Sequence, residues 1–216
     1  MEDSLIHKAL REKLIEELRT KGISDEKVLQ AMLQVPRHFF CFDSALAQQA
    51  YIDKAFPIES GQTISQPYTV ALQSQLLEIQ GNEKVLEIGK GSGDQSAILY
   101  KMGAKVYSIE RQRTLYIQVK KLFQDLHYQI HTILGDGFKG MPQDAPFDRI
   151  IITAAAPFIP TELLQQLKIG GILVSPLKNG DKQEMVKLKK LSDTQFEQTL
   201  HGECAFVPML QGISNQ

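Results

Sequence analysis

The spacing of the hydrophobic positions changes near Gly81. Before this point, apolar residues recur at helical spacing between charged ones, as Leu10, Leu14 and Leu18 do. Beyond it, short apolar runs typical of strands alternate with segments of helical spacing. The pattern therefore predicts a helical N-terminal extension followed by an α/β core.

Within the extension, the pattern predicts one helix over residues 5–19, with Gly22 as its C-terminal cap. Ser24 has the side chain of an N-cap and opens a second helix, which Pro36 stops. A short third helix is expected near residues 44–50.

A loop rich in hydroxyl groups follows over residues 58–68 and leads into a helix over residues 68–77. Ser65 is placed like the N-cap of that helix, with Pro67 near the first turn. Spacing alone therefore favours a structural role for Ser65, in which its hydroxyl only caps the helix.

The core pattern predicts five strands, three helices and a late hairpin. Alternating strands and helices imply a parallel sheet that helices cover on both faces. We therefore expect an α/β fold with a doubly wound, mostly parallel Rossmann-like sheet and a C-terminal antiparallel hairpin. The expected strands lie at residues 84–88, 105–110, 130–134, 149–153 and 171–176, the helices at 95–102, 112–126 and 161–167, and the hairpin arms at 183–191 and 199–207.

The 216 residues are 43% hydrophobic, enough for a substantial core. We expect one domain over residues 1–216, in which residues 1–80 pack on a core of residues 81–216. The net charge of −1 gives no overall attraction to nucleic acid or membrane, and no apolar run approaches the ~20 residues that span a bilayer. Cys41 and Cys204 lack metal-ligand spacing, and no secretory signal is visible, so we expect a cytoplasmic monomer without a metal.

The candidate chemistry centres on residues 85–93, where an apolar run ends at three glycines. Glycines permit positive φ and close approach of a ligand, and the next helix offers free N–H groups at its N-terminus. The spacing of Gly89, Gly91 and Gly93 is GxGxG rather than the dinucleotide-binding GxGxxG. Glu87 completes ExGxGxG, the common form in methyltransferases that use S-adenosylmethionine.

Two further carboxylates end the next two strands. Glu110 lies about 20 residues beyond the turn, where a carboxylate can accept hydrogen bonds from both ribose hydroxyls, although it would also suit solvent beside Arg111. Asp136, followed by Gly137, could accept from an adenine amino group, although Asp-Gly is also a common turn dipeptide. The three motifs in this order favour S-adenosylmethionine as the cofactor.

With these motifs, the chain resembles the protein-L-isoaspartate O-methyltransferases, repair enzymes that methylate isoaspartyl residues in aged proteins. The resemblance covers nearly the whole chain, and its most specific segment is Gly-Gln-Thr-Ile-Ser-Gln-Pro at residues 61–67. The other matching segments are residues 35–39, 50–53, 85–93, 108–111, 135–137, 145–148, 153–155 and 170–174, Gln183, and residues 206–208.

The resemblance implies a role for each matching residue. Ser65 matches the active-site serine beside the transferable methyl group, Glu110 the ribose contact, and Asp136 with Gly137 the adenine contacts. The loop glycines match the turn under the methionyl group, and two further residues flank the pocket. The expected cofactor-binding set is Thr63, Ile64, Glu87, Gly89, Gly91, Gly93, Glu110, Asp136 and Gly137.

The implied substrate is an isoaspartyl peptide or protein, and the implied acceptor is its α-carboxylate. Carboxyl groups titrate near ~4, so this one is anionic at neutral pH and needs no general base. We therefore assign Ser65 an orienting hydrogen bond and no nucleophilic role. The methyl ester would lose methanol to the neighbouring amide nitrogen, giving a succinimide that hydrolyses partly to normal aspartate.

Two loop positions depart from the family, which usually has a small residue between the first two glycines and an aromatic residue after the third. Lys90 and Asp94 stand there, and we hypothesise that they form an ion pair. His38 could hold the acceptor or pack in the core. Two rival functions stay open: a methyltransferase with a small-molecule or RNA acceptor, and a cofactor-binding sensor without catalysis.

Overall fold

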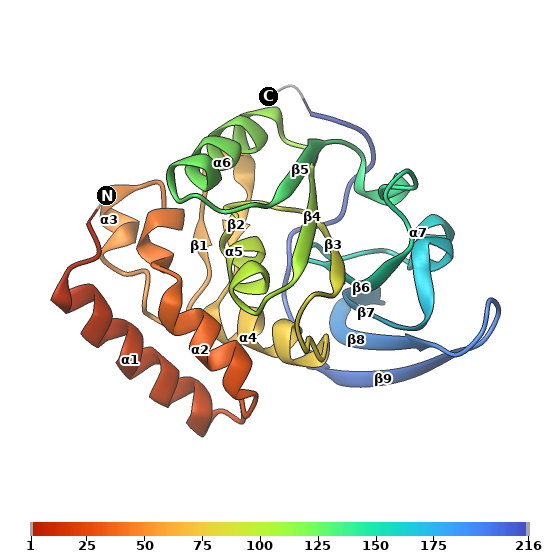
Figure 1. Ribbon diagram of the computed structural model, residues 1–216, viewed down its shortest axis with the longest axis horizontal. Coiled ribbons are helices and arrows are strands. Elements are labelled where there is room, and N and C mark those ends of the chain that lie inside the picture. Colours follow the sequence, from red (N-terminus) through yellow and green to blue (C-terminus); the bar gives the residue numbers. More distant parts are fainter. Residues whose placement is uncertain (1, 215–216) are drawn as a thin grey trace.

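A seven-stranded sheet forms the centre of the computed structural model, which describes residues 2–214 (Figure 1). Its strands are β3 (Lys84–Ile88), β4 (Lys105–Glu110), β5 (His131–Leu134), β6 (Phe147–Ile152), β7 (Leu167–Asn179), β8 (Lys182–Lys190) and β9 (Phe196–Glu203). They lie in the order β5-β4-β3-β6-β7-β8-β9. All neighbours from β5 to β7 pair in parallel, whereas β8 pairs antiparallel with β7 and with β9. The expected doubly wound sheet with an antiparallel C-terminal hairpin is thus confirmed.

Helices cover both faces of this sheet (Figure 1). On one side lie α4 (Pro67–Leu76), α5 (Asp94–Lys101) and α6 (Arg113–Asp125), and on the other lies α7 (Thr161–Gln166). The extension adds an outer layer, α1 (Leu5–Thr20) and α2 (Glu26–Gln34), of which α2 contacts both α4 and α5. Within residues 2–214, no helix has the length and apolar character that crossing a membrane requires.

Short elements connect these layers. The turns η1 (Arg37–Phe40), η2 (Glu59–Gly61) and η3 (Gly137–Lys139) are 3-10 helices, and α3 (Ser44–Ala47) is a single α-helical turn. The strands β1 (Phe56–Pro57) and β2 (Thr63–Ile64) pair antiparallel as a separate small sheet. This small sheet holds the loop that contains the family-specific segment.

Alternate residues of the central strands face two different hydrophobic clusters. In β6, Ile151 belongs to the cluster that also contains helix residues such as Leu18 and Ile98. Its neighbours Ile150 and Ile152 belong to a second cluster with Leu163 of α7. Both faces of the central parallel strands are therefore buried, as a parallel sheet requires.

The predicted boundaries mostly agree with the structure, with four corrections. The strand predicted at residues 171–176 is longer, because β7 runs from Leu167 to Asn179. The N-cap of α2 is Asp25 rather than Ser24, because the Asp25 carboxylate accepts the backbone N–H of Lys27. The third helix ends at Ala47 instead of residue 50. The last strand begins at Phe196, three residues before the predicted arm, because Leu191 N–H and Ser192 N–H both donate to the Gln195 carbonyl and close the hairpin turn.

We predict that Gly93→Ala lowers the free energy of unfolding by about 2–5 kcal/mol, measured by urea denaturation. The φ angle of Gly93 is +88°, and a Cβ there would lie 2.5 Å from Val119 Cγ1 on α6, so backbone strain and overpacking add. The matched control is Gly22→Ala, which has φ +95° but open space around its Cβ and should cost only about 1–2 kcal/mol. Equal losses for the two variants would contradict the packing argument.

Candidate active site

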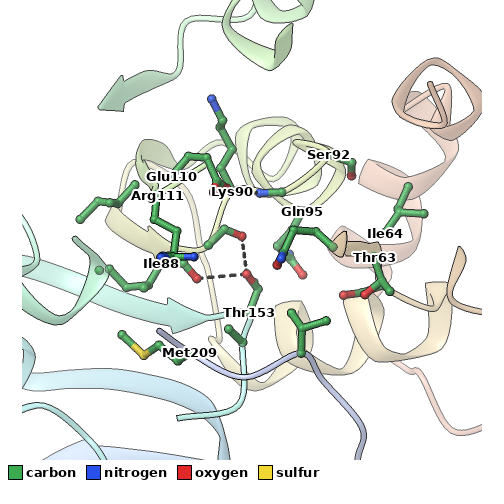
Figure 2. A pocket seen from close by; sticks show the side chains of 18 of the residues that line it. Thr63, Ile64, Ile88, Lys90, Ser92, Gln95, Glu110, Arg111, Thr153 and Met209 are labelled. Carbon is green, nitrogen blue, oxygen red and sulfur yellow. Dashed lines mark hydrogen bonds between the residues drawn. The ribbon is translucent and has the colours of Figure 1, made fainter. Parts of the chain in front are cut away.

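A cavity opens at the carboxyl ends of β3, β4 and β6 (Figure 2). This is the switch point of the sheet, since β3 lies between β4 and β6. Figure 2 shows Thr63 and Ile64 on one side of the space and Ile88, Arg111 and Met209 on the other. The lining residues are Gln62, Thr63, Ile64, Ser65, Val70, Ile88, Gly89, Lys90, Gly91, Ser92, Asp94, Gln95, Ile109, Glu110, Arg111, Gly137, Thr153, Ala154, Val207, Pro208, Met209 and Leu210.

The glycine turn leaves β3 along the floor of this cavity. A Cβ on Gly89 would lie 2.8 Å from the hydroxyl oxygen of Thr153, which itself donates to the carbonyl oxygens of Ile88 and Gly89 (Figure 2). Gly89 and Gly91 line the cavity, whereas Gly93 is the N-cap of α5 and is packed against α6. The first two glycines thus shape the cavity and the third allows two helices to approach.

Glu110 ends β4 and is held in a fixed orientation. Its Oε2 accepts the backbone N–H of Gly91 and its Oε1 that of Gln112, both at 2.8 Å. Burial raises the pKa of this carboxyl group, and the two N–H donors oppose that shift. Each carboxylate oxygen can accept a second hydrogen bond, so Glu110 can still bind a pair of hydroxyls in the cavity.

Glu87 lies beneath the turn and is not among the lining residues. It is fully buried, and its Oε2 accepts hydrogen bonds from the hydroxyls of Ser96 on α5 and Ser108 on β4. Burial raises its pKa to about 7. The other oxygen, Oε1, has no hydrogen-bond partner within residues 2–214. Glu87 therefore ties β3, β4 and α5 together from behind the cavity.

The loop after β5 brings Gly137 to the cavity and turns Asp136 away. The Asp136 carboxylate accepts the backbone N–H of Phe138 at 3.0 Å and that of Gly212 at 2.9 Å. Gly137 lines the cavity, and a Cβ there would collide with Ile88 Cγ2. In this geometry Asp136 fixes the C-terminal segment against the loop.

Ser65 follows β2 on the opposite wall, and the expectation that its hydroxyl caps the next helix is wrong. α4 begins at Pro67 with Gln66 as its N-cap, and no side chain caps it. Among the described residues, Ser65 forms a hydrogen bond through its carbonyl oxygen, which accepts from Arg37. The hydroxyl is therefore available at the wall of the cavity.

The hypothesised ion pair between Lys90 and Asp94 is also wrong. Asp94 is buried against Arg37 and forms an ion pair with it. The Lys90 ammonium instead donates to the carbonyl of Tyr116 at 3.2 Å and lies 4.8 Å from the centre of that ring. Burial lowers the Lys90 pKa to about 8. The two charges thus have separate partners.

Several residues at the site were not assigned roles from the sequence. Arg37, Thr153 and residues 207–210 all lie in or near segments that carry the family resemblance, which was the available signal. His38 lies outside the lining, where its Nδ1 is 2.8 Å from the hydroxyl of Tyr51 and its ring stacks on His7. Core packing is thus the reading of His38 that the contacts support.

A methionine-bearing nucleoside fits this set of donors and acceptors. Glu110 presents a fixed carboxylate, the glycine turn leaves backbone exposed beside α5, and Ile88, Ile109 and Met209 supply an apolar wall. Because α5 begins at the turn, the positive end of its dipole faces the same space.

Comparisons with known proteins agree on one family. The model of the family described as protein-L-isoaspartate(D-aspartate) O-methyltransferase matches residues 9–214. A protein-L-isoaspartate O-methyltransferase of Flavobacterium johnsoniae is 53% identical over 98% of this chain and 99% of its own length. One of Cytophaga hutchinsonii is 50% identical over 97% of this chain and 95% of its own.

Solved structures show the same fold. A protein-L-isoaspartate O-methyltransferase superposes with a TM-score of 0.84 at 29% identity, covering 92% of this chain and 65% of the other. A candidate member from Plasmodium falciparum, in complex with S-adenosyl-L-homocysteine, superposes with a TM-score of 0.81 at 23% identity, covering 93% of this chain and 98% of the other.

We predict that Glu87→Gln changes the pH dependence of unfolding. The folded pKa of Glu87, about 7, lies above the ordinary value of 4.5, so the folded protein holds a proton that the unfolded chain releases. The wild type should therefore lose stability relative to the variant as the pH rises from 4.5 to about 7, by about 3 kcal/mol in total. Urea denaturation of both proteins across this range tests it, and parallel curves would contradict it.

We predict that Lys90→Thr and Asp94→Tyr act independently on the affinity for S-adenosylhomocysteine. Their charged groups bind different partners, Tyr116 and Arg37, so the double variant should equal the sum of the single ones within about 0.5 kcal/mol. Isothermal titration calorimetry on the four proteins measures this sum. A coupling energy above about 1 kcal/mol would restore the hypothesis of a direct pair.

Proposed function

The chain belongs to the protein-L-isoaspartate(D-aspartate) O-methyltransferase family, and from this premise we propose which residues bind the two substrates and which orient them for methyl transfer. The protein transfers the methyl group of S-adenosylmethionine to the α-carboxylate of isoaspartyl residues in damaged proteins. Formation of this methyl ester starts repair through a succinimide. The cavity at the ends of β3, β4 and β6 is the site that we assign to this reaction.

One observation carries the assignment: Thr63 and Ser65 border two neighbouring spaces. One is the cavity described above, and the other is a pocket lined in part by Tyr68, Met185 and Ala205. We assign the cofactor to the first space and the acceptor peptide to the second. Ser65 would then stand where the two substrates meet.

For the cofactor we propose contacts of two kinds. Thr63, Ile64 and Glu110, together with Gly89, Gly91 and Gly137, line the cavity and would touch it directly. Glu110 is the acceptor that we assign to the ribose hydroxyls. The other three residues would act without touching the cofactor. Glu87 would fix the turn, Gly93 the start of α5, and Asp136 the C-terminal segment.

The chemistry needs alignment more than proton transfer. S-adenosylmethionine, when bound, supplies an electrophilic methyl group on a positively charged sulfur. The acceptor carboxylate is already anionic, so the protein has to hold one of its oxygens in line with the methyl group. We propose that the Ser65 hydroxyl donates to this carboxylate, because it lies at the junction and has no competing partner among the described residues.

We further propose that the protein acts as a single domain, with residues 1–80 packed on residues 81–216, and as a cytoplasmic monomer. One hydrophobic cluster joins Leu18 and Leu29 of the extension to Ile98 and Phe123 of the core, which supports a single unit. Cys41 and Cys204 are free thiols, which suits a reducing compartment.

We predict that Ser65→Ala lowers kcat/KM for an isoaspartyl peptide about 10–100-fold, because one hydrogen bond to a charged group is lost. The dissociation constant of S-adenosylhomocysteine should change less than about threefold. Transfer of labelled methyl to an isoaspartyl peptide, with the normal aspartyl peptide as the control, measures the activity. Unchanged kcat/KM would remove Ser65 from the mechanism, and equal labelling of both peptides by the wild type would overturn the substrate.

A further inference from the structure

Arg37 is a buried cation that bridges three segments of the chain. It is 4% exposed and begins η1. Its Nε donates to the carbonyl of Ala50 at 2.9 Å, its Nη2 donates to the carbonyl of Ser65 at 2.6 Å, and its Nη1 pairs with Asp94. Because the guanidinium group is planar and rigid, these three directions are fixed relative to one another.

The residues that follow Ser65 have an anchor of their own, because the Asp53 carboxylate accepts the backbone N–H of Tyr68 at 2.7 Å and the side-chain amide of Gln66 at 3.0 Å. The residues that precede Ser65 are held by few backbone hydrogen bonds. Ile58 N–H donates to Gln62, and β2 pairs only with the two-residue strand β1. The first backbone carbonyl used by α4 belongs to Gln66, whose partner is Val70 N–H, so the helix does not engage the carbonyl of Ser65. Among the described residues, Arg37 is therefore the side chain that binds the backbone of Ser65 itself, whereas Asp53 holds the residues that follow it.

The other end of the bridge lies in the cofactor turn. Asp94 is the first residue of α5, directly after Gly93, and it lines the cofactor cavity. Both members of the ion pair are buried, so each charge depends on the other for compensation. The cofactor turn and the backbone of Ser65 are thus joined through one rigid group.

We propose that Arg37 is a positioning residue for methyl transfer, which sets the Ser65 hydroxyl relative to the cofactor turn by binding the Ser65 carbonyl and Asp94 at once. This inference rests on the role of Ser65 proposed above. Arg37 does not line the cofactor cavity, so it acts only through the residues that it holds.

The test is a double-mutant cycle between Arg37→Lys and Ser65→Ala, read by kcat and KM for an isoaspartyl peptide. A lysine keeps the charge beside Asp94, but its single nitrogen lacks the planar fork that reaches the three acceptors. We expect Arg37→Lys to lower kcat about 10–100-fold with little change in the dissociation constant of S-adenosylhomocysteine. In the Ser65→Ala background the same change should cost less than about threefold, because the hydroxyl that it positions is already gone.

The control is Arg19→Lys, the same replacement in an exposed ion pair with Glu26, which should leave both constants unchanged. If Arg37→Lys does not fold, Arg37→Gln with Asp94→Asn enters the same cycle, because it removes both charges together. If the losses of kcat caused by Arg37→Lys and Ser65→Ala multiply in the double variant, the positioning role is overturned. A large loss of S-adenosylhomocysteine affinity in Arg37→Lys would overturn it as well. A wild type that fails to methylate the peptide, or an unaffected Ser65→Ala, would instead overturn the proposed function.

Discussion

The site depends on one feature of the sheet topology: the chain leaves β3 and its neighbour β6 toward opposite faces of the sheet. β3 continues into α5 on one face of the sheet, whereas its neighbour β6 continues toward α7 on the other (Figure 1). No connection therefore crosses the end of β3, and a crevice is left there. The glycine turn and Thr153 form its floor, and the β2 segment and the C-terminal segment close its sides. Moving any of these walls would change the space available to both substrates.

The crevice is surrounded by buried ionisable groups, and each is compensated in a different way. Two serine hydroxyls donate hydrogen bonds to Glu87, and two backbone N–H groups donate to Glu110. Arg37 forms an ion pair with Asp94. Lys90 relies on a carbonyl and an aromatic ring. Burial of such groups opposes folding, and the network is only partly engaged, because Glu87 Oε1 and Asp94 Oδ1 have no hydrogen-bond partner among the described residues. The contacts that the network does form join the cofactor turn to β4 and to Arg37.

The N-terminal extension contributes to the geometry of the reaction as well as to the core. Its helix α2 contacts α4 and α5, and its connecting segments supply both Ser65 and Arg37. The pocket assigned to the acceptor is therefore built in part from residues that precede the first strand of the central sheet, together with Met185 and Ala205 from the C-terminal part of the chain. A minimal Rossmann-like core could hold the cofactor, but it would lack the group that orients the carboxylate.

The sequence by itself determined the elements, the sheet class and the family, because periodicity, glycine placement and capping act over a few residues. It also located the turn, Glu110 and the segment around Ser65. Only the tertiary structure decided which way the side chains point: Glu87 and Ile88 are adjacent in β3, yet Ile88 lines the cavity and Glu87 lies behind it. It also showed that Asp94 forms its ion pair with Arg37, 57 positions away in the sequence, and not with the nearby Lys90. The partner of a buried charge is set by the packing of distant segments, and local sequence patterns do not contain that information.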